Sequence, residues 1–486
     1  MKKEKRNLFI TIIVFVVLNI NLHGSALFPG IEDDSLQWFP SLAANNGTVY
    51  VAWADERNGN YTRIMNNQPH KSGDIYISKG SFQDGWVFDK NIRINEIKGT
   101  TGHGSPSIAV DNNNLYVVWE DDRFGIEELY FSMAEKNNIQ FKKDLPVVAE
   151  IGSQVLPSIS VLNGTVYIAM MNKKNLDIDF TEGYPVNGVY SFGKTIRVND
   201  DSSGNWHYAP SIAVDDEKNV CIAWLDARNG NYDIYFSHGI KDNGIWQFSQ
   251  NARVNDDSTN ASQYTPSIAF ENGSAYIAWY DDRNKDFDIF FSTGRLENNS
   301  WKFDKNIRIN DIGNGNQMHP ALAVRNGEIF VVWEDERDGA SNIYFSRGSS
   351  KKEGFEFIKN IKVNDIKGKH YDPQIGISLD NIYVVWQSEV NDSGDIYFSH
   401  GKYNGKNWKF SRNIKVNDDL TDYFTKPDPL FLVLVPGSVI VSIIVVGFLR
   451  RYGKIETKNE KYLTLFGFLS GSASILIFIA IYSLLN

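Results

Sequence analysis

The chain has 486 residues, 13% of them aromatic, and its 59 acidic residues outnumber its 49 Lys and Arg residues to give a formal net charge of −10. This charge, without a long run of one sign, argues against a nucleic-acid partner, because binding a phosphate backbone requires clustered positive charge. A chain of this length exceeds one ordinary hydrophobic core but suits an array of repeats that each bury a face against the next. The single cysteine, Cys221, lies in the apolar run NVCIAW and is interpreted as a small buried hydrophobic residue.

Residues 1–26 have the pattern of a secretory signal peptide. Basic residues at the start precede an apolar run from about Leu8 to Leu18, and a group of small residues ends at Ala26. We expect cleavage after Ala26. The alternative is an uncleaved anchor, but the apolar run is shorter than the roughly 20 residues that span a bilayer. The domain at residues 27–418 is therefore predicted to be extracytoplasmic.

Two uncharged apolar segments, residues 430–449 and 462–485, are each long enough to form a transmembrane helix. A linker, residues 419–429, connects the first segment to the large domain. The loop between the segments, residues 450–461, carries the basic residues Arg450, Arg451, Lys454, Lys458 and Lys461. The positive-inside rule places this loop in the cytoplasm, so the sequence predicts a multi-pass anchor at the cell membrane with the large domain outside.

Seven copies of one pattern precede these segments, spaced about 50 to 65 residues apart, and they open at Pro40, Pro106, Pro157, Pro210, Pro266, Pro320 and Pro373. The fifth copy shows the plan: PSIAF from Pro266, AYIAWYDDR from Ala275, DIFFS from Asp288 and WKFDKNIRIND from Trp301. Runs rich in β-branched and aromatic residues between Gly, Asn and Asp clusters are typical of strands. The predicted fold class is all-β, a seven-bladed β-propeller of four-stranded antiparallel blades, with six blades as the alternative.

Asn-Gly pairs between the first and second predicted strands begin at Asn46, Asn163, Asn272 and Asn326. Asn-Gly accepts the positive φ angles of a type I′ hairpin. Some of these turns also belong to the sequons that start at Asn46, Asn60, Asn163, Asn260, Asn272, Asn298 and Asn391. The sequons fit a glycosylated exterior in a host with the machinery.

Loops between the third and fourth predicted strands end in an aromatic residue, as in FQDGW, KDNGIW and ENNSW. Together with the strand plan PSIAV, VYVAW, DIYFS and RVNDD, they resemble the sialidase-like (BNR/Asp-box repeat) β-propeller family over about residues 35–418. The resemblance implies the architecture, whereas many relatives bind ligands without catalysis. For an exo-sialidase it would imply an arginine triad, a tyrosine nucleophile helped by a glutamate, and an aspartate acid/base. No catalytic residue can be assigned, and the nearest string to the family's Arg-Ile-Pro start is Arg63-Ile64-Met65.

Two recurrent motifs are predicted to meet on one face, here called the upper face, which holds the loops between second and third strands and the links to the next blade. The first motif pairs a turn acid with an arginine, and its members are Asp55 with Arg57, Asp121 with Arg123, Asp226 with Arg228, Asp281 with Arg283, and Asp335 with Arg337. The second motif is the Asn-Asp end of the fourth strand, as at Asn199-Asp200. The arginines are candidate ligands for a carboxylated sugar. A structural role, in which Asp closes the turn and Arg ties loops together, is favoured because the pair recurs around the ring.

The residue three before each opening proline is always Gln or His, at Gln37, His103, Gln154, His207, Gln263, Gln317 and His370. Because the first strands surround the channel, we expect a polar ring near its upper mouth, with His103, His207 and His370 as candidate binding residues. These histidines fall in blades two, four and seven. Joint ligation of a metal is therefore not expected, no metal site is assigned, and each side chain is expected to bond within its own blade.

Repeats three and seven depart from the pattern. Repeat three has Met170 in place of Trp, Asn172 in place of the acid and Lys174 in place of Arg, and repeat seven has Ser388 and Val390 in place of the pair. Repeat one carries an insertion at residues 62–73 on the upper face. Adaptation to a ligand and simple decay of the repeat are left as equal alternatives.

These observations predict a membrane-anchored, extracytoplasmic, non-catalytic module that binds a surface glycan or a membrane-protein partner, or serves as a scaffold. The alternative is an exo-sialidase-like glycoside hydrolase acting on acidic sugars, for which carboxyl groups cannot be chosen among so many repeated acids. No cofactor is expected. Calcium in the NDDS-type loops is an alternative without assigned ligands, since hard oxygen ligands gather there.

Overall fold

The computed structural model describes residues 36–418, apart from 60–61, 66–67, 72, 100–101, 149–151, 203, 312, 353 and 391–392, together with residues 461–470 and 474–483. For residues 62–71, 393 and 461–483 it describes the backbone only. The predicted signal peptide, the linker, the first predicted span and residues 450–460 lie outside the described residues. The chain divides into two units at residues 419 and 420, and each is described by itself.

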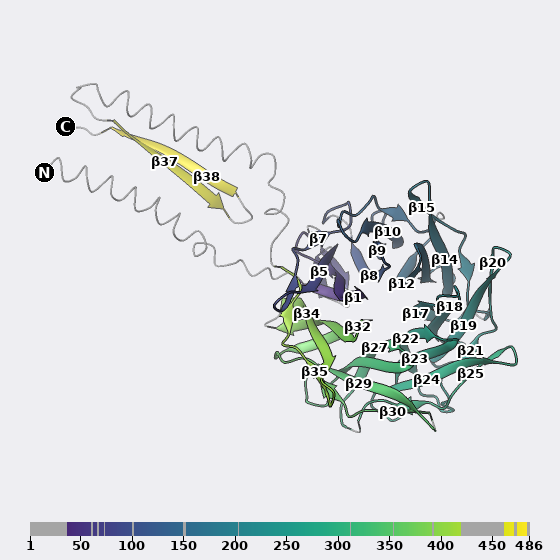
Figure 1. The fold of residues 1–486 in the computed structure, drawn as a ribbon. Coiled ribbons are helices and arrows are strands. Elements are labelled where there is room, and N and C mark those ends of the chain that lie inside the picture. The colour runs from purple at the N-terminus through teal and green to yellow at the C-terminus, as the bar shows by residue number, and fades with distance from the viewer. Residues whose placement is uncertain are drawn as a thin grey trace. The chain divides into compact units, whose positions relative to one another are not determined.

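Seven antiparallel sheets, the blades, follow one another around a ring, with their first strands nearest its centre (Figure 1). The inner three strands of each blade are, in chain order, β1 (Gln37–Asn45), β2 (Thr48–Asp55) and β5 (Asp74–Phe82); β8 (His103–Val110), β9 (Asn114–Asp121) and β10 (Glu128–Glu135); β12 (Gln154–Leu162), β13 (Thr165–Asn172) and β14 (Asp177–Val186); β17 (His207–Val214), β18 (Val220–Asp226) and β19 (Asp233–Asp242); β22 (Gln263–Glu271), β23 (Ser274–Asp281) and β24 (Asp288–Glu297); β27 (Gln317–Arg325), β28 (Glu328–Asp335) and β29 (Asn342–Lys351); β32 (Lys369–Ser378), β33 (Asn381–Val390) and β34 (Ser393–Tyr403). The prediction of a seven-bladed propeller is confirmed, and the six-bladed alternative is wrong.

The fourth, outer strand is split into two short segments in six blades, which pair with successive parts of the third strand. These segments are β6 (Trp86–Phe88) and β7 (Ile92–Arg93), β15 (Val189–Phe192) and β16 (Ile196–Arg197), β20 (Ile245–Phe248) and β21 (Ala252–Arg253), β25 (Ser300–Phe303) and β26 (Ile307–Arg308), β30 (Gly354–Phe357) and β31 (Ile361–Lys362), and β35 (Trp408–Phe410) and β36 (Ile414–Lys415). Blade two is irregular in a way that the sequence did not reveal, because among its described residues the outer edge has β11 (Leu145–Pro146) alone.

A glycine in the third strand explains how the first outer segment packs. In blade five, Gly294 pairs with Phe303, and a Cβ atom at Gly294 would lie 2.5 Å from Cε1 of the Phe303 ring. The same Gly–Phe contact occurs in the other blades with a split outer strand. Blade two has Ala134 at the equivalent position, opposite Leu115, and among the described residues no outer strand pairs with it, although it is fully buried.

The core consists of apolar clusters that each join two neighbouring blades. Between blades four and five, for example, Phe236 and Trp301 pack with their ring centroids 4.7 Å apart, and fully buried Cys221 belongs to the same cluster, as predicted. The ring closes when Val49 and Trp53 of blade one pack with Val385 and Phe398 of blade seven. Each blade therefore buries its faces against two neighbours, which is how a repeat protein obtains a continuous core.

The Asn-Gly turns have the predicted geometry. Asn272 and Gly273, between β22 and β23, have φ angles of 51° and 71°, and the other three Asn-Gly pairs are likewise positive at both residues. Positive φ at both central residues is the mark of a type I′ turn, and Asn-Gly accommodates it at low steric cost. The insertion in blade one forms an antiparallel hairpin of β3 (Thr62–Met65) and β4 (Gln68–Lys71).

In the second unit, β37 (Lys461–Ser470) and β38 (Ser474–Ser483) pair as an antiparallel hairpin. The sequence predicts a helix over residues 462–485, so the described backbone differs from that expectation. Among the residues that the structure describes, no helix has the length and apolar character needed to cross a membrane. Membrane anchoring stays a prediction.

Candidate ligand-binding site at the upper mouth

The Asp–Arg pairs of the upper face are part of a repeated contact between blades, which we call the latch. At the entry to blade four, Arg228 donates from Nε and Nη2 to Asp226, and from Nη1 to Asp200 of the preceding blade at 2.8 Å. Its guanidinium carbon lies 4.1 Å from the centroid of the Tyr235 ring. Asp200 also accepts from the backbone N–H of Asn251 at 3.0 Å. One arginine thus connects its own turn to the blade before it.

Three of the other four arginines likewise join their own turn acid to an acid of the preceding blade, and their partners are Asp55 and Asp418 for Arg57, Asp281 and Asp256 for Arg283, and Asp335 and Asp311 for Arg337. Arg123 differs, because both of its partners, Asp121 and Asp144, lie in blade two, and Asp144 accepts from the backbone N–H of Glu96 in the preceding blade at 3.0 Å. Burial alone would lower the pKa of these guanidiniums, but the paired carboxylates raise it, so they remain charged. The Arg57 latch closes the ring, since Asp418 belongs to blade seven. Each arginine is engaged within the fold, and ligand binding by these residues stays an untested prediction.

The Gln and His residues that begin the first strands are buried inside the blades. Gln263 accepts from Nδ2 of Asn255 at 2.7 Å, and Gln317 accepts from Nδ2 of Asn310 at 2.7 Å. His103 binds the carbonyl of Gly73 through Nδ1 at 2.8 Å and has Nε2 at 3.0 Å from Oδ2 of Asp121. The predicted ring of Gln and His side chains is thus buried and hydrogen-bonded within the fold, and its bonds are not confined to one blade, since His103 also contacts the carbonyl of Gly73 in blade one. Ligand binding by His103, His207 and His370 stays an untested prediction. A Gln side chain at these positions can bond both to the end of the fourth strand of the preceding blade and to the turn acid of its own blade, as Gln317 does with Asn310 and Asp335.

Every first strand contains a β-bulge, and this bulge determines which side chains lie at the upper mouth of the channel. The pairing of β1 with β2 slips between Trp38 and Ser41, and Phe39 in the bulge has a φ of 52°. Equivalent residues in all blades have positive φ, directly before the opening proline: Phe39, Ser105, Leu156, Ala209, Thr265, His319 and Asp372. Positive φ is unfavourable for residues with a Cβ atom, so the surrounding sheet must hold this conformation. A bulge of this kind redirects side chains, which here brings bulge residues of neighbouring blades together.

A pocket of about 240 Å³ lies where the bulges of blades one to three meet. Its lining residues come from four consecutive blades, and they are Phe39, Gly104, Ser105, Glu120, Glu127, Val155, Leu156, Met171, Lys173, Trp206 and Tyr208. Phe39, Trp206 and Tyr208 are 41%, 51% and 41% exposed, which is high for large aromatic side chains. We call this the mouth pocket. It is smaller than the roughly 300–1,000 Å³ of sites that enclose a drug-sized ligand, so it suits one ring-sized group.

Charged groups in the mouth pocket are placed by contacts between blades two and three. Nζ of Lys173 lies 3.1 Å from Oε1 of Glu127, and Ser153 donates to Oε2 of Glu127 at 3.1 Å. Burial raises the pKa of Glu127, but the hydrogen bond from Lys173 outweighs it, so the pKa is lowered and the carboxylate is ionised at neutral pH. Glu120 accepts from the backbone N–H of Leu156 at 2.7 Å. The pocket thus offers two carboxylates and one ammonium beside three aromatic faces.

A second group of titratable residues lies at the bulges of blades six and seven. Nδ1 of His319 lies 2.8 Å from Oε1 of buried Glu334 and 4.0 Å from Oδ1 of Asp372. Burial and the charge of Glu334 raise the pKa of Asp372 to about 6. Tyr371 bonds to Glu389, and burial together with nearby carboxylates raises its pKa to about 12. This phenol therefore stays protonated at neutral pH.

Three findings bear on the hydrolase alternative. The five latch arginines lie in five different blades, and among the residues whose side chains the structure describes no arginine lines the mouth pocket. A further pocket of about 190 Å³, at the outer edge between blades two and three, also has no arginine in its lining. Tyr371 and Glu389 form a Tyr–Glu pair, but no described contact joins them to a latch arginine. The described residues of the mouth pocket can recognise a polar ring through aromatic and carboxylate groups.

No protein-family model and no curated protein matches the chain. Among solved structures, a Dyadobacter fermentans protein of unknown function is 8% identical, with a TM-score of 0.45 over 76% of this chain and 95% of that one. A Trypanosoma rangeli sialidase bound to the inhibitor DANA is 10% identical, with a TM-score of 0.42 over 63% of this chain and 55% of that one. The intramolecular trans-sialidase of Ruminococcus gnavus is 9% identical, with a TM-score of 0.40 over 74% and 92%. At these values nothing about activity follows.

Sequence reasoning located the latch motifs and the irregular third repeat, two of whose residues, Met171 and Lys173, line the mouth pocket. It did not find Phe39, Trp206 or Tyr208. The bulge residues share no side-chain type, so their only sequence signal is the proline that follows each of them.

Proposed function

We propose that this protein is a non-catalytic binding propeller on the extracytoplasmic side of a cell membrane, anchored by its C-terminal segments, and that the mouth pocket binds one residue of a glycan. The observation that carries this proposal is the gathering of exposed Phe39, Trp206 and Tyr208 around one pocket with Glu120 and Glu127. Aromatic faces cover the apolar side of a sugar ring, and carboxylates accept hydrogen bonds from its hydroxyl groups. The mouth pocket therefore has both the aromatic faces and the hydrogen-bond acceptors that binding of a sugar ring requires.

The hydrolase alternative is less favoured by the same chemistry. Tyr371 bonds to Glu389, as a tyrosine nucleophile would to its general base, but no described contact joins this pair to an arginine. An acidic sugar also needs cationic partners, whereas the latch arginines are already paired with aspartates. Binding without turnover is the simpler use of this surface.

The test uses the full-length chain in detergent on a glycan array, together with release of a fluorophore from a sialoside. We expect retention of a defined set of glycans without hydrolysis, and a loss of affinity of at least about tenfold in Trp206→Ala, as for an aromatic residue at the centre of an interface. Phe82→Ala is the control, because Phe82 is 63% exposed at the outer end of β5. Fluorophore release by the wild type that disappears in Tyr371→Phe would establish the hydrolase instead.

A further inference from the structure

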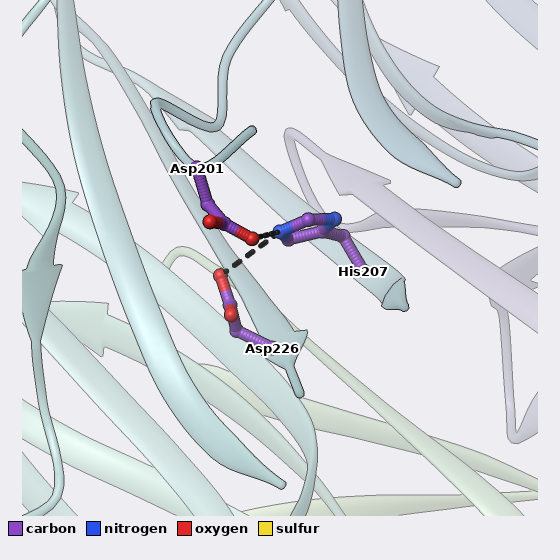
Figure 2. A group of neighbouring side chains, drawn as sticks. All are labelled: Asp201, His207 and Asp226. Carbon is purple, nitrogen blue, oxygen red and sulfur yellow. Dashed lines mark ion pairs between the residues drawn. The ribbon is translucent and has the colours of Figure 1, made fainter. Parts of the chain in front are cut away.

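Three side chains converge at the junction of blades three and four: Asp201, His207 and Asp226 (Figure 2). Asp201 belongs to the link from blade three, His207 begins β17, and Asp226 ends β18. Nε2 of His207 lies 3.4 Å from Oδ2 of Asp226 and 3.6 Å from Oδ2 of Asp201. The two carboxylates thus flank one imidazole nitrogen.

That nitrogen is the unusual feature. His207 is 1% exposed, and within the described part of the chain its Nε2 atom has no hydrogen-bond partner. Nδ1 lies 2.7 Å from the carbonyl oxygen of Leu176, which can only accept, so Nδ1 carries a proton. In the neutral ring Nε2 is therefore a bare lone pair aimed between two carboxylates. A buried polar atom without a partner is costly, and a backbone carbonyl bound to the far nitrogen is the usual support of a metal-binding histidine.

The equivalent histidines of other blades do not share this arrangement. His103 has Nε2 at 3.0 Å from Asp121, a hydrogen-bonding distance, and the link before it has Ile97 where blade four has Asp201. His370 binds Ser388 and the carbonyl of Ile366, which again replaces the link acid. Of these three histidines, His207 alone combines a turn acid with a link acid.

We propose that Asp201, His207 and Asp226 bind one zinc ion. Zinc bonds of about 2.0–2.2 Å at tetrahedral angles place two ligand atoms about 3.3–3.6 Å apart, which matches both Nε2–Oδ2 distances. Imidazole with two carboxylates suits zinc or a similar transition metal, whereas calcium and magnesium prefer ligand sets made of oxygen alone. A water molecule would complete the tetrahedron.

The neighbouring contacts orient the ligands and indicate how the ion enters. Oδ2 of Asp226, the proposed ligand atom, accepts from Nε1 of Trp224 at 2.9 Å and from Nη2 of Arg228 at 2.7 Å, while Oδ1 accepts from the backbone N–H and Nε of Arg228. These bonds hold the carboxylate in place, and zinc would replace one of the two bonds to Oδ2. The charge of Arg228 lowers the affinity for a cation, and the paired Asp200 partly offsets it. The Asp201 side chain is 14% exposed, so the ion enters from the upper face. Zinc would fasten the link from irregular blade three to blade four. This site is separate from the proposed glycan pocket.

The test is zinc binding by the full-length chain in detergent, purified without a histidine tag and stripped with chelator. We expect one zinc per chain by elemental analysis, a tetrahedral visible spectrum with cobalt, and a rise in Tm of about 2–5 °C at saturating zinc. His207→Gln and Asp201→Asn should no longer bind this zinc ion, and zinc should no longer raise their Tm. His207→Gln should still fold, because glutamine occupies the same position in blade five, where Gln263 bonds to Asn255.

His103→Gln is the matched control and should keep the zinc. Equal zinc content in wild type and His207→Gln would overturn the proposal, as would a wild-type Tm that zinc does not change. If both His207→Gln and His103→Gln lost the bound zinc ion, the loss would reflect a general effect on the fold rather than a zinc site at His207. This result would also overturn the proposal.

Discussion

Blades five and seven are built on the same plan but differ at the latch. In blade five, Asp281 accepts from Nε1 of Trp279 and from the backbone and side chain of Arg283, which also reaches Asp256 of blade four. In blade seven, Ser388 takes the place of the acid, and within the described residues Nε1 of Trp386 has no hydrogen-bond partner. At the junction of blades six and seven, no arginine occupies the latch position, and Asp365 and Asn413 still bond to each other's backbone N–H groups.

The difference shows that ring closure does not require every latch. Trp386 is as fully buried as the other strand-two tryptophans, so the apolar contact between neighbouring blades survives without the polar one. A blade released from the latch can use its loop residues elsewhere, as blade three does with Met171 and Lys173 in the mouth pocket. The latch therefore adds stability and fixes the loops, while the apolar clusters set the fold.

The largest expected effect is loss of a latch acid. Asp281→Ala removes the acceptor of Trp279 and leaves part of the buried Arg283 charge unpaired, which costs about 3–5 kcal/mol of unfolding free energy. Ser388→Ala removes one neutral hydrogen bond, to Nδ1 of His370 at 2.9 Å, and should cost about 1 kcal/mol. Urea unfolding followed by tryptophan fluorescence compares the two. If Asp281→Ala were no costlier than Ser388→Ala, the latch would not be a stabilising element.

The equivalent histidines of blades two and seven, His103 and His370, have pKa values shifted in opposite directions, so the two blades should respond differently to pH. Burial lowers the pKa of His370 from 6.5 to about 4. Between these two pKa values the unfolded chain binds a proton at this histidine and the folded chain does not. The free energy of unfolding therefore falls by about 3 kcal/mol as the pH drops from 6.5 to about 4. Burial also lowers the pKa of His103, but the hydrogen bond and charge of Asp121 outweigh it and raise the pKa. The His103 contribution is fully present below pH 6.5 and is lost as the pH rises through the raised pKa.

Single substitutions to glutamine separate these contributions. His370→Gln should flatten the loss of stability between pH 6.5 and 4, whereas His103→Gln should flatten the change on the alkaline side. Unfolding midpoints across this range, with histidine titrations by NMR, provide the measurement. An unchanged acid slope in His370→Gln would contradict the assignment.

The third comparison sets blade five against blade two, which lacks the first outer segment. Gly294→Ala would place Cβ 2.5 Å from the Phe303 ring, so Phe303 must shift, at a cost of about 1–3 kcal/mol. Blade two already carries Ala134 at this position, and Phe141, the counterpart of Phe303, lies outside any strand. Gly85→Ala, where the new Cβ would meet no atom within 4 Å, is the control and should change stability by less than about 0.5 kcal/mol. Equal costs at the two positions would refute the packing explanation.

The fold could be predicted from the sequence because the strands and turns of each repeat are determined by residues close together in the chain. Asn272-Gly273 specifies a type I′ turn through its own backbone preferences, and the WxDxR spacing places Asp281 and Arg283 in one turn. The mouth pocket could not be predicted, because Phe39 and Trp206 are separated by three blades along the chain and meet only after the ring closes. The site of Asp201 and His207 likewise depends on how one link packs against one strand.

The smallest effect on stability tests whether blade three has been adapted or has merely decayed. Lys173 pairs with Glu127 while both side chains are 42% exposed, so Lys173→Ala should cost no more than about 0.5 kcal/mol. Lys351, paired with Glu356 on blade six and also exposed, offers a matched control in Lys351→Ala. Both variants should unfold at the wild-type urea midpoint, but only Lys173→Ala should weaken glycan retention, because only Lys173 lines the mouth pocket. A lysine that contributes to binding without contributing to stability is what adaptation of blade three requires. If both variants bound the array like the wild type, the departures of repeat three would reflect decay of the latch alone.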